Sequence, residues 1–298
     1  MCIRDSYTEW FVAQTERAIH KYHMFGPDDR VLVAVSGGKD SLSLWRVLLQ
    51  LGYQADGLYV DLGIDGGFGY SRLSCEKIET FAAEYPQATL HVVDVAAEYG
   101  QPVPDVAQRK LRGRGKPCAV CGLIKRHEMN RIARQHGYSV LATGHNLDDE
   151  VAVLLSNTLH WQAGYLARQA PVLEEQDGLA RKVKPLCRLY EREVAAYALI
   201  QGIDYIYEEC PFVEGSTTLF YKELLNRLEA HSPSSKLQFY LSFLRARKEG
   251  LFTAESEPVE LHPCPVCDQP TSVPGPVSYT HLRAHETPEH LVCRLLLE

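Results

Sequence analysis

Short apolar runs alternate along the chain with segments whose apolar residues recur every three or four positions. Runs typical of buried strands cover residues 30–35, 55–61, 89–95, 138–143 and, more briefly, 204–207. Helical spacing fills the intervals, over residues 41–51, 71–85, 120–135, 148–161 and 191–201. Because strands that alternate with helices form parallel sheets, this pattern predicts an α/β fold with helices on both faces of a parallel sheet.

Helical spacing also lies outside the predicted sheet. Trp10, Phe11, Ala18 and Ile19 predict a helix from residue 7 to about residue 25, which Gly26–Pro27 ends. Residues 217–248 have the pattern of a wholly helical segment. We therefore divide the chain into an N-terminal helix at 7–24, an α/β domain at 25–210, a helical C-terminal region at 211–256 and a short cysteine-bearing segment at 257–276.

The two ends of the chain differ in character from the rest. Residues 1–6 (MCIRDS) and 277–298 (VSYTHLRAHETPEHLVCRLLLE) resemble translated sequencing-adapter read-through. We expect these two segments to have no selected function.

The cysteine-bearing segment contains the pair Cys264 and Cys267, followed by His281 and His285 at the spacing of a zinc finger. The stretch between them is rich in proline, which suits neither the hairpin nor the helix of such a finger. We therefore interpret the cysteine pair as half of a four-cysteine zinc knuckle, an incomplete Zn²⁺ site.

Composition narrows the class of protein. The first residues lack a basic stretch followed by an apolar core, and no apolar run is long enough for a membrane helix, so we expect a cytoplasmic protein. Nine cysteines in such a chain favour metal ligands or catalytic groups over disulfides. The net charge of −7 argues against indiscriminate binding to polyanions, yet one basic strip has the charge to hold phosphates or to be a solvated surface. This basic strip comprises Arg109, Lys110, Arg112, Arg114 and Lys116, followed by Lys125, Arg126, Arg131 and Arg134.

A glycine-rich loop, Ser36-Gly37-Gly38-Lys39-Asp40-Ser41, joins the first predicted strand to the next helix. Bare backbone amides at such a turn bind anions, and glycines let the backbone approach phosphate oxygens closely. Lys39 adds positive charge, and the two serines add hydroxyl donors. Because the spacing differs from a Walker A loop, the alternatives are another phosphate loop or a tight turn with a serine cap.

A second strand-to-helix turn, residues 143–150 (TGHNLDDE), carries consecutive acids. Carboxylates at Asp148 and Asp149 are favoured by the helix dipole, but capping the helix requires only one. A catalytic role and a structural one both remain open here.

Three further cysteines have the pattern of reactive or ligating groups. Cys118 and Cys121 have CxxC spacing, and Cys210 stands alone before a proline. A lone CxxC also fits a zinc half-site or a redox pair. We expect Cys187 and Cys75 to be small core residues.

Together, the glycine-rich loop, the segment Cys118–Gly122, the pairs Lys125–Arg126 and Asn130–Arg131, and the acidic turn resemble the PP-loop ATPases, or adenine nucleotide alpha hydrolases. Within them, the resemblance is to the tRNA 2-thiouridine synthetase group, most closely the enzymes that act on 5-methyluridine 54, with wobble-uridine relatives. It covers residues 25–267, nearly all of the chain between its two ends. It implies that ATP is cleaved between its α- and β-phosphates, that uridine O2 is adenylated, and that sulfur then replaces this oxygen.

The resemblance also implies the site residues. Cys118, Cys121 and Cys210 would bind a [4Fe-4S] cluster whose free iron accepts sulfur, or would form a persulfide relay. Lys125 and Asp149 would join these cysteines in catalysis, Asp149 through Mg²⁺ or as a proton acceptor, and adenine would lie near Tyr59 and Val60. The residues expected to contact ATP are Ala34, Val35, Ser36, Gly37, Gly38, Lys39, Asp40, Ser41, Val60, Lys125, Gly144 and Asp149.

Partners follow from the same resemblance. They are tRNA, a ubiquitin-like sulfur-carrier protein with a C-terminal thiocarboxylate, and a second copy of the chain in a homodimer. The family has a zinc knuckle at each end, whereas this sequence lacks the N-terminal one and keeps only Cys264 and Cys267 of the other.

Three alternative functions remain. Lysidine synthases do not need the three cysteines, and cytidine-32 thiolation enzymes lack terminal zinc knuckles, so the cysteines count against both. A non-catalytic zinc and RNA-binding module would leave the glycine-rich loop unexplained.

Overall fold

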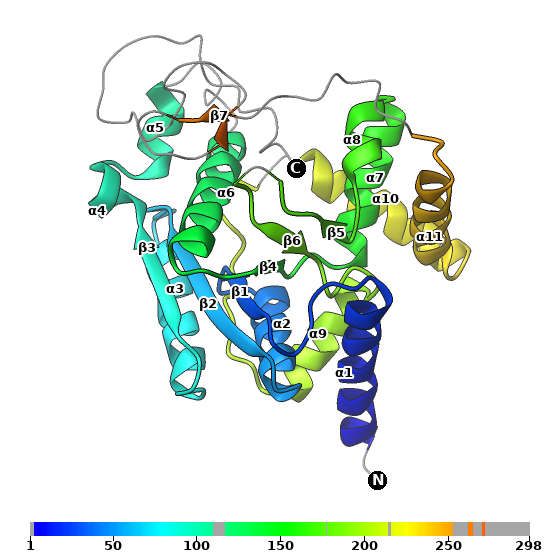
Figure 1. Cartoon of the computed structure of the whole chain (residues 1–298), viewed down its shortest axis with the longest axis horizontal. Helices are drawn as coiled ribbons and strands as arrows, with labels where there is room; N and C mark the ends of the chain where they lie inside the picture. Colours follow the sequence, from blue (N-terminus) through cyan, green and yellow to red (C-terminus); the bar gives the residue numbers. More distant parts are fainter. Residues whose placement is uncertain are drawn as a thin grey trace.

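A six-stranded, mostly parallel sheet organises the chain in the computed structural model, which describes residues 3–109, 117–176, 178–213, 216–252, 262–264 and 270–271 (Figure 1). The strands are β1 (Arg30–Val35), β2 (Gln54–Asp61), β3 (Leu90–Asp94), β4 (Val140–Thr143), β5 (Val172–Leu173) and β6 (Arg181–Val183), with β7 (His262–Pro263) and β8 (Pro270–Thr271) in a separate pair. The helices are α1 (Ile3–Lys21), α2 (Lys39–Gln50), α3 (Tyr70–Ala83), α4 (Val95–Tyr99), α5 (Val103–Arg109), α6 (Pro117–Gln135), α7 (Leu147–Leu159), α8 (Ala163–Arg168), α9 (Glu191–Ile200), α10 (Thr217–His231) and α11 (Ser235–Lys248).

The strand order is β3-β2-β1-β4-β6-β5, and only the edge pair β5–β6 is antiparallel. The chain therefore leaves β1 in one direction to build β2 and β3, and later returns to the other side of β1 with β4. In doubly wound sheets, ligands bind at the carboxyl ends of the strands where the order reverses in this way. The turns that follow β1 and β4 are the glycine-rich loop and the acidic turn that the sequence predicts as candidate functional segments.

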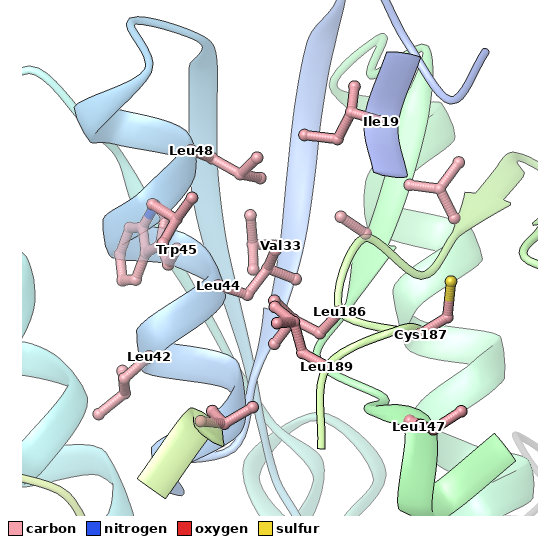
Figure 2. Close-up of a cluster of buried hydrophobic side chains, with 14 of the residues drawn as sticks. Ile19, Val33, Leu42, Leu44, Trp45, Leu48, Leu147, Leu186, Cys187 and Leu189 are labelled. Carbon is pink, nitrogen blue, oxygen red and sulfur yellow. The ribbon is translucent and has the colours of Figure 1, made fainter. Parts of the chain in front are cut away.

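Alternate side chains of the sheet enter two different cores, which confirms that helices cover both faces. Val31 and Val33 of β1 belong to the larger core, with α1, α2 and α9, whereas Leu32 belongs to the smaller core beneath α6. Figure 2 shows the larger core, with Leu44 and Leu48 of α2 facing Val33, and the Trp45 indole donates to the Ala55 carbonyl of β2 at 2.9 Å. Buried on both faces, β1 has the continuous apolar sequence expected of a central parallel strand.

Two predicted elements need correction, and two strands were not predicted. Residues 204–207 form no strand, because this segment crosses the glycine-rich loop, where the Ile206 amide donates to the Gly37 carbonyl at 2.9 Å. Residues 217–248 are two helices and not one, since Ser232-Pro233-Ser234 breaks them and Ser234 adopts a left-handed φ of 72°. The strands β5 and β6 were missed because each is only two or three residues long.

The C-terminal helices α10 and α11 pack against α7, the helix that follows β4 (Figure 1). Tyr221, Leu225, Tyr240 and Phe243 bury their side chains in the larger core. The C-terminal region is therefore part of the same hydrophobic unit as the sheet, and it lies beside the acidic turn.

The short pair β7–β8 brackets the second CxxC segment. Cys264 directly follows β7 and is buried, whereas Cys267 lies outside the described residues, as do residues 277–298. Zinc binding by this pair stays a prediction. At the other end, Ile3–Ser6 belong to α1. Within the described part of the chain, no helix is both long and apolar enough to cross a membrane.

His127 on α6 should make folding sensitive to acid. Burial, followed by the charge of Arg131, lowers the pKa of this ring from its ordinary 6.5 to about 4. Between pH 6.5 and about 4, His127 takes up a proton in the unfolded chain but stays neutral in the folded protein. The free energy of unfolding therefore falls as the pH drops below 6.5. Between pH 7 and 5, a His127→Gln variant should therefore lose about 2 kcal/mol less unfolding free energy than the unmodified protein, at ~1.4 kcal/mol per pH unit. Urea unfolding at both pH values measures this difference, and equal losses would contradict it.

Candidate active site

A cavity of about 820 Å³ opens at the carboxyl ends of β1, β2 and β4. Its size lies within the range of small-molecule sites. Four segments that are distant in sequence contribute to its wall: the glycine-rich loop, the acidic turn, the start of α6, and the segment around Cys210. The predicted site residues that line it are Ala34, Val35, Ser36, Asp40, Ser41, Tyr59, Val60, Cys118, Cys121, Lys125, Gly144, Asp149 and Cys210.

The glycine-rich loop has the geometry of an anion cradle. The Ser41 hydroxyl accepts from the Ser36 amide at 3.1 Å and donates to the Gly38 carbonyl at 3.1 Å, which holds the loop closed. Gly37 adopts a left-handed φ of 79°. No side chain caps α2 at Gly38, so the first-turn amides of this helix remain available to a ligand.

Gly144 allows the two strand-to-helix turns to meet. A Cβ atom at this position would lie 2.9 Å from both the Asp40 carbonyl carbon and the Ser41 amide nitrogen. Sequence analysis assigned this glycine to close approach by nucleotide, and the structure adds a backbone contact between the two turns.

A Gly144→Ala variant should therefore be less stable by about 1–3 kcal/mol, because two backbones must move apart. Gly164 on α8 is the matched control, since an added Cβ there meets nothing within 4 Å. Gly164→Ala should be neutral or stabilise by up to about 1 kcal/mol. Urea unfolding measures the free energy of unfolding of both variants. Equal values for Gly144→Ala and Gly164→Ala would contradict a close backbone contact at Gly144.

The three acids of the acidic turn have different environments. Asp149 forms a capping box with Asn146, whose amide donates to Asp149 Oδ2 at 3.0 Å, and it also lines the cavity. Asp148 is buried, where it pairs with Lys236 and accepts the Glu191 amide at 2.8 Å. Glu150 is also buried and pairs with Lys184 at 2.9 Å. Asp148 thus has a structural role, whereas Asp149 and Glu150 both line the cavity, and Asp149 also caps the helix.

An ion chain links the glycine-rich loop to the acidic turn through Asp40, Lys39, Glu191, Lys222 and Asp149. The Lys39 ammonium lies 3.1 Å from Asp40 and 3.0 Å from Glu191 Oε1. Lys222 of α10 bonds the other Glu191 oxygen at 3.1 Å and Asp149 Oδ1 at 2.6 Å. Burial opposes the charge of both lysines, yet their carboxylate neighbours outweigh it and raise the pKa of each. Burial likewise raises the pKa of Asp40, against the opposing effect of Lys39.

The three predicted cluster ligands face one cavity from two chain segments. Cys118 and Cys121 lie one turn apart at the start of α6, and the Cys118 thiol lies 3.4 Å from the carbonyl of Phe212, close after Cys210. Burial first raises the pKa of Cys121 to about 11; Lys125 opposes the rise, while Cys118 and Cys210 add to it. The thiols of Cys118, Cys121 and Cys210 are therefore close enough to interact electrostatically.

No group of three or more His, Cys, Asp or Glu side chains among the described residues is arranged for a single metal ion. Cys118, Cys121 and Cys210 nevertheless line the same cavity.

Some predicted residues have other roles or lie elsewhere. Gly37, Gly38 and Lys39 belong to the glycine-rich loop without lining the cavity. Within the basic strip, Lys125 and Arg126 line the cavity, whereas Arg131 pairs with Glu98 and Glu128 at 2.8 and 2.6 Å. Residues 110–116 of the strip lie outside the described part of the chain. Cys187 is buried in the larger core as predicted, and Cys75 packs at its edge.

Sequence analysis missed several parts of the site. A loop with glycines at positions 63, 66, 67 and 69 follows β2, and this density of glycine could have marked it as a special turn; all four adopt positive φ angles in the structure. A Cβ at Gly66 would lie 2.1 Å from the ring of Pro211, so this loop packs against the residue next to Cys210. Other residues missed are Tyr70, Ser71, Ser74, His145, Lys182, Lys184, Glu191 and Lys222.

Comparison with known proteins agrees with this geometry. Residues 29–206 match the family described as tRNA methyl transferase HUP domain. The tRNA-5-methyluridine(54) 2-sulfurtransferase of Thermus thermophilus is 49% identical over 269 residues, which cover 90% of this chain and 81% of that protein. The protein of the same name from Pyrococcus horikoshii is 42% identical over 271 residues, or 90% of this chain and 83% of its own length.

A solved structure has the same fold. The U34-tRNA thiolase NcsA from Methanococcus maripaludis, determined with its [4Fe-4S] cluster, superimposes with a TM-score of 0.67 at 23% identity. The superposition covers 81% of this chain and 80% of that one.

Proposed function

This chain belongs to the tRNA-5-methyluridine(54) 2-sulfurtransferase family, and from that premise we propose that it uses ATP to replace O2 of a tRNA uridine with sulfur. The observation that carries the proposal is the meeting of the glycine-rich loop, Asp149 and three thiols on one cavity. The first two suit nucleotide activation, and the thiols suit delivery of sulfur. Neither half alone would convert a carbonyl into a thiocarbonyl.

The first step activates the uracil carbonyl. Uridine O2 attacks the α-phosphorus of ATP, the bond from that phosphorus to the β-phosphate bridge breaks, and pyrophosphate leaves as the N3 proton is lost. The chain's own contribution is to orient the phosphates on the α2 amides and to neutralise the leaving group with Lys39 and Lys125. Asp149 faces the same cavity, where it is placed to accept the N3 proton or to hold a cation.

The carboxylates of Asp40 and Asp149 are the oxygen ligands that suit Mg²⁺, which few protein groups and several phosphate oxygens usually hold. Burial raises the pKa of Asp40, and the nearby charge of Asp149 adds to that rise after the opposing effect of Lys39. Asn146 holds the two carboxylates near each other, because its side-chain amide donates to Asp40 Oδ1 at 3.1 Å and its backbone amide to Asp149 Oδ2 at 3.0 Å, so both would be available to hold Mg²⁺. When bound, Mg²⁺ would supply charge neutralisation for the departing pyrophosphate.

In the second step, sulfur bonds to C2 and the C2–O bond breaks, so that AMP leaves with the original oxygen. Cys118, Cys121 and Cys210 would hold a [4Fe-4S] cluster, whose remaining iron supplies sulfide chemistry that protein side chains lack. A thiol with a pKa of about 11, such as Cys121, stays protonated at neutral pH until a metal displaces the proton. The chain's residues then orient the activated carbon toward that side of the cavity and exclude water from it.

Partners follow from the same reaction. We propose a tRNA substrate, a ubiquitin-like carrier with a C-terminal thiocarboxylate as the sulfur source, and a homodimer as the assembly. The Cys264 and Cys267 pair would hold zinc only with further ligands.

Mass spectrometry of tRNA nucleosides after incubation with ATP and sulfide tests the function. We expect 2-thiouridine or its 5-methyl derivative, formed only with ATP and accompanied by AMP and pyrophosphate. A reaction without ATP is the control. Thiolated cytidine would instead favour the cytidine-32 reaction, and lysidine with unchanged sulfur content would favour lysidine formation.

A further inference from the structure

Lys222 lies in α10, outside residues 29–206, the range shared with the matched family. It reaches back to the acidic turn and joins the ion chain defined above. Its side chain is 17% exposed, so α10 holds the ammonium largely within the protein. The Lys222 ammonium is thus held between Glu191 and Asp149, beside the candidate active site.

Lys222 and Lys39 share one carboxylate. Glu191 gives Oε1 to Lys39 at 3.0 Å and Oε2 to Lys222 at 3.1 Å, so the two ammonium groups flank the same anion. Lys39 belongs to the glycine-rich loop that would cradle phosphates. Glu191 therefore lies between a lysine of the glycine-rich loop and a lysine of the C-terminal region.

The charge of Lys222 also acts on the cavity. His145 lines that cavity, and burial first lowers the pKa of its ring to about 3, with smaller contributions from Lys182, Lys184 and Lys222. The Lys222 partner Asp149 lines the cavity as well. Lys222 itself is not among the residues that line the cavity, so its contact with Asp149 at 2.6 Å is what connects it to the cavity wall.

Three carboxylates and two ammonium groups form the ion chain, which leaves an excess of negative charge where a polyphosphate would bind. A purely structural network of this kind contributes little stability, because desolvation offsets most of the Coulomb energy. Clustered, strongly perturbed ionisable groups beside a cavity are candidates for a functional role. The arrangement makes sense if the carboxylates are temporary partners of the lysines.

We propose that Lys222 is a second phosphate-binding cation of the nucleotide site, and that Glu191 and Asp149 hold it in place until the β- and γ-phosphates of ATP replace them. This inference rests on the proposed function and adds a binding residue to the same site. Phosphate would accept from the Lys39 and Lys222 ammonium groups together, while the carboxylates turn to other partners. No covalent bond changes in this exchange.

Isothermal titration of the full-length chain with pyrophosphate, ATP and AMP tests the proposal. Lys222→Gln should weaken pyrophosphate and ATP binding about tenfold or more, the effect of one lost charge-assisted hydrogen bond. AMP, which lacks the two outer phosphates, should bind within about twofold of its original affinity, and Lys222→Arg should restore most ATP binding. Arg227→Gln is the matched control, since Arg227 is an exposed cation on the same helix, paired with Glu223 at 2.6 Å.

A second variant keeps the test decisive if Lys222→Gln fails to fold. Glu191→Gln removes the competing anion while leaving both lysines, so it should strengthen pyrophosphate binding a few-fold. A structural role for the bridge predicts weaker or unchanged binding instead, and that outcome would overturn the proposal. Equal losses of ATP and AMP affinity in Lys222→Gln would overturn it as well. An unmodified protein that binds no ATP would overturn the proposed function and this inference together, whereas ATP binding that Lys222→Gln leaves unchanged would overturn the inference alone.

Discussion

Replacing Lys39 with alanine should lower the rate of ATP-dependent thiolation by about 100- to 1000-fold, the usual effect of removing one preorganised group that stabilises developing charge. Lys39 is the cation at the start of α2, and its ammonium bonds Asp40 and Glu191 at 3.1 and 3.0 Å. Pyrophosphate would depart from this turn. Without Lys39, the loop amides would face the leaving charge beside Asp40, which would have lost its lysine partner, whereas Glu191 would keep Lys222.

Formation of AMP from ATP in the presence of tRNA measures this effect. Lys77→Ala is the matched control, because Lys77 forms a surface ion pair with Asp204 at 2.6 Å and does not line the cavity. That variant should retain activity within about twofold, as expected for an exposed pair. A loss of less than tenfold in Lys39→Ala would place the pyrophosphate away from the glycine-rich loop.

Replacing Cys210 with serine should remove the iron–sulfur absorption band of anaerobically reconstituted protein and reduce thiolation by roughly 1000-fold or more. Cys210 is the thiol that comes from a different segment than α6, so its loss leaves only the CxxC pair. ATP binding should remain within about twofold, because the glycine-rich loop is unchanged. Visible absorption, iron content and ATP titration measure the three properties.

Cys75→Ser is the control for this second prediction. Cys75 lies on α3, where its thiol contacts Glu79 at 3.6 Å and does not line the cavity. This variant should keep both the band and the activity. A full four-iron cluster in Cys210→Ser would remove Cys210 from the ligand set and would favour a persulfide role for it.

Much of the fold was predictable because the strands of a buried parallel sheet have a strong signal. Residues 31–35 are apolar throughout and, with the exposed Arg30 before them, form β1 with the predicted bounds. The signal weakens at the edge of the sheet, where β6 has only three residues, two of them lysine or arginine. The segment 204–207 has the composition of a strand, yet its amide at Ile206 bonds the glycine-rich loop. Local pattern cannot distinguish an extended segment that pairs in a sheet from one that crosses a loop.

The candidate site was predictable where chemistry is local in sequence. The glycine-rich loop and the acidic turn can each be identified from a few consecutive residues, and the topology of the sheet brings them together. Glu191 and Lys222 carry no such local signal, since each lies on an amphipathic helix where a charged residue is ordinary. Their role depends on the packing of α9 and α10 against the turns after β1 and β4, which only the folded structure reveals.

The glycines differ in the same way. Gly37 was expected to matter because it belongs to a recognisable motif, and its φ of 79° explains why glycine is needed. Gly66 lies in a run without an assigned motif, although its contact with Pro211 ties the loop after β2 to the segment that bears Cys210. Spatial proximity, not spacing along the chain, makes this glycine part of the site.

The buried pairing of Lys236 with Asp148 limits how the ATP-binding part could be transplanted. Lys236 of α11 is 2% exposed and also bonds Asn226 of α10. A graft that ended after Cys210 would remove the cationic partner of Asp148 together with Tyr221, Leu225, Tyr240 and Phe243, which the C-terminal helices bury in the larger core. Anyone who swaps this ATPase unit into another tRNA enzyme would therefore have to carry both terminal helices along with it.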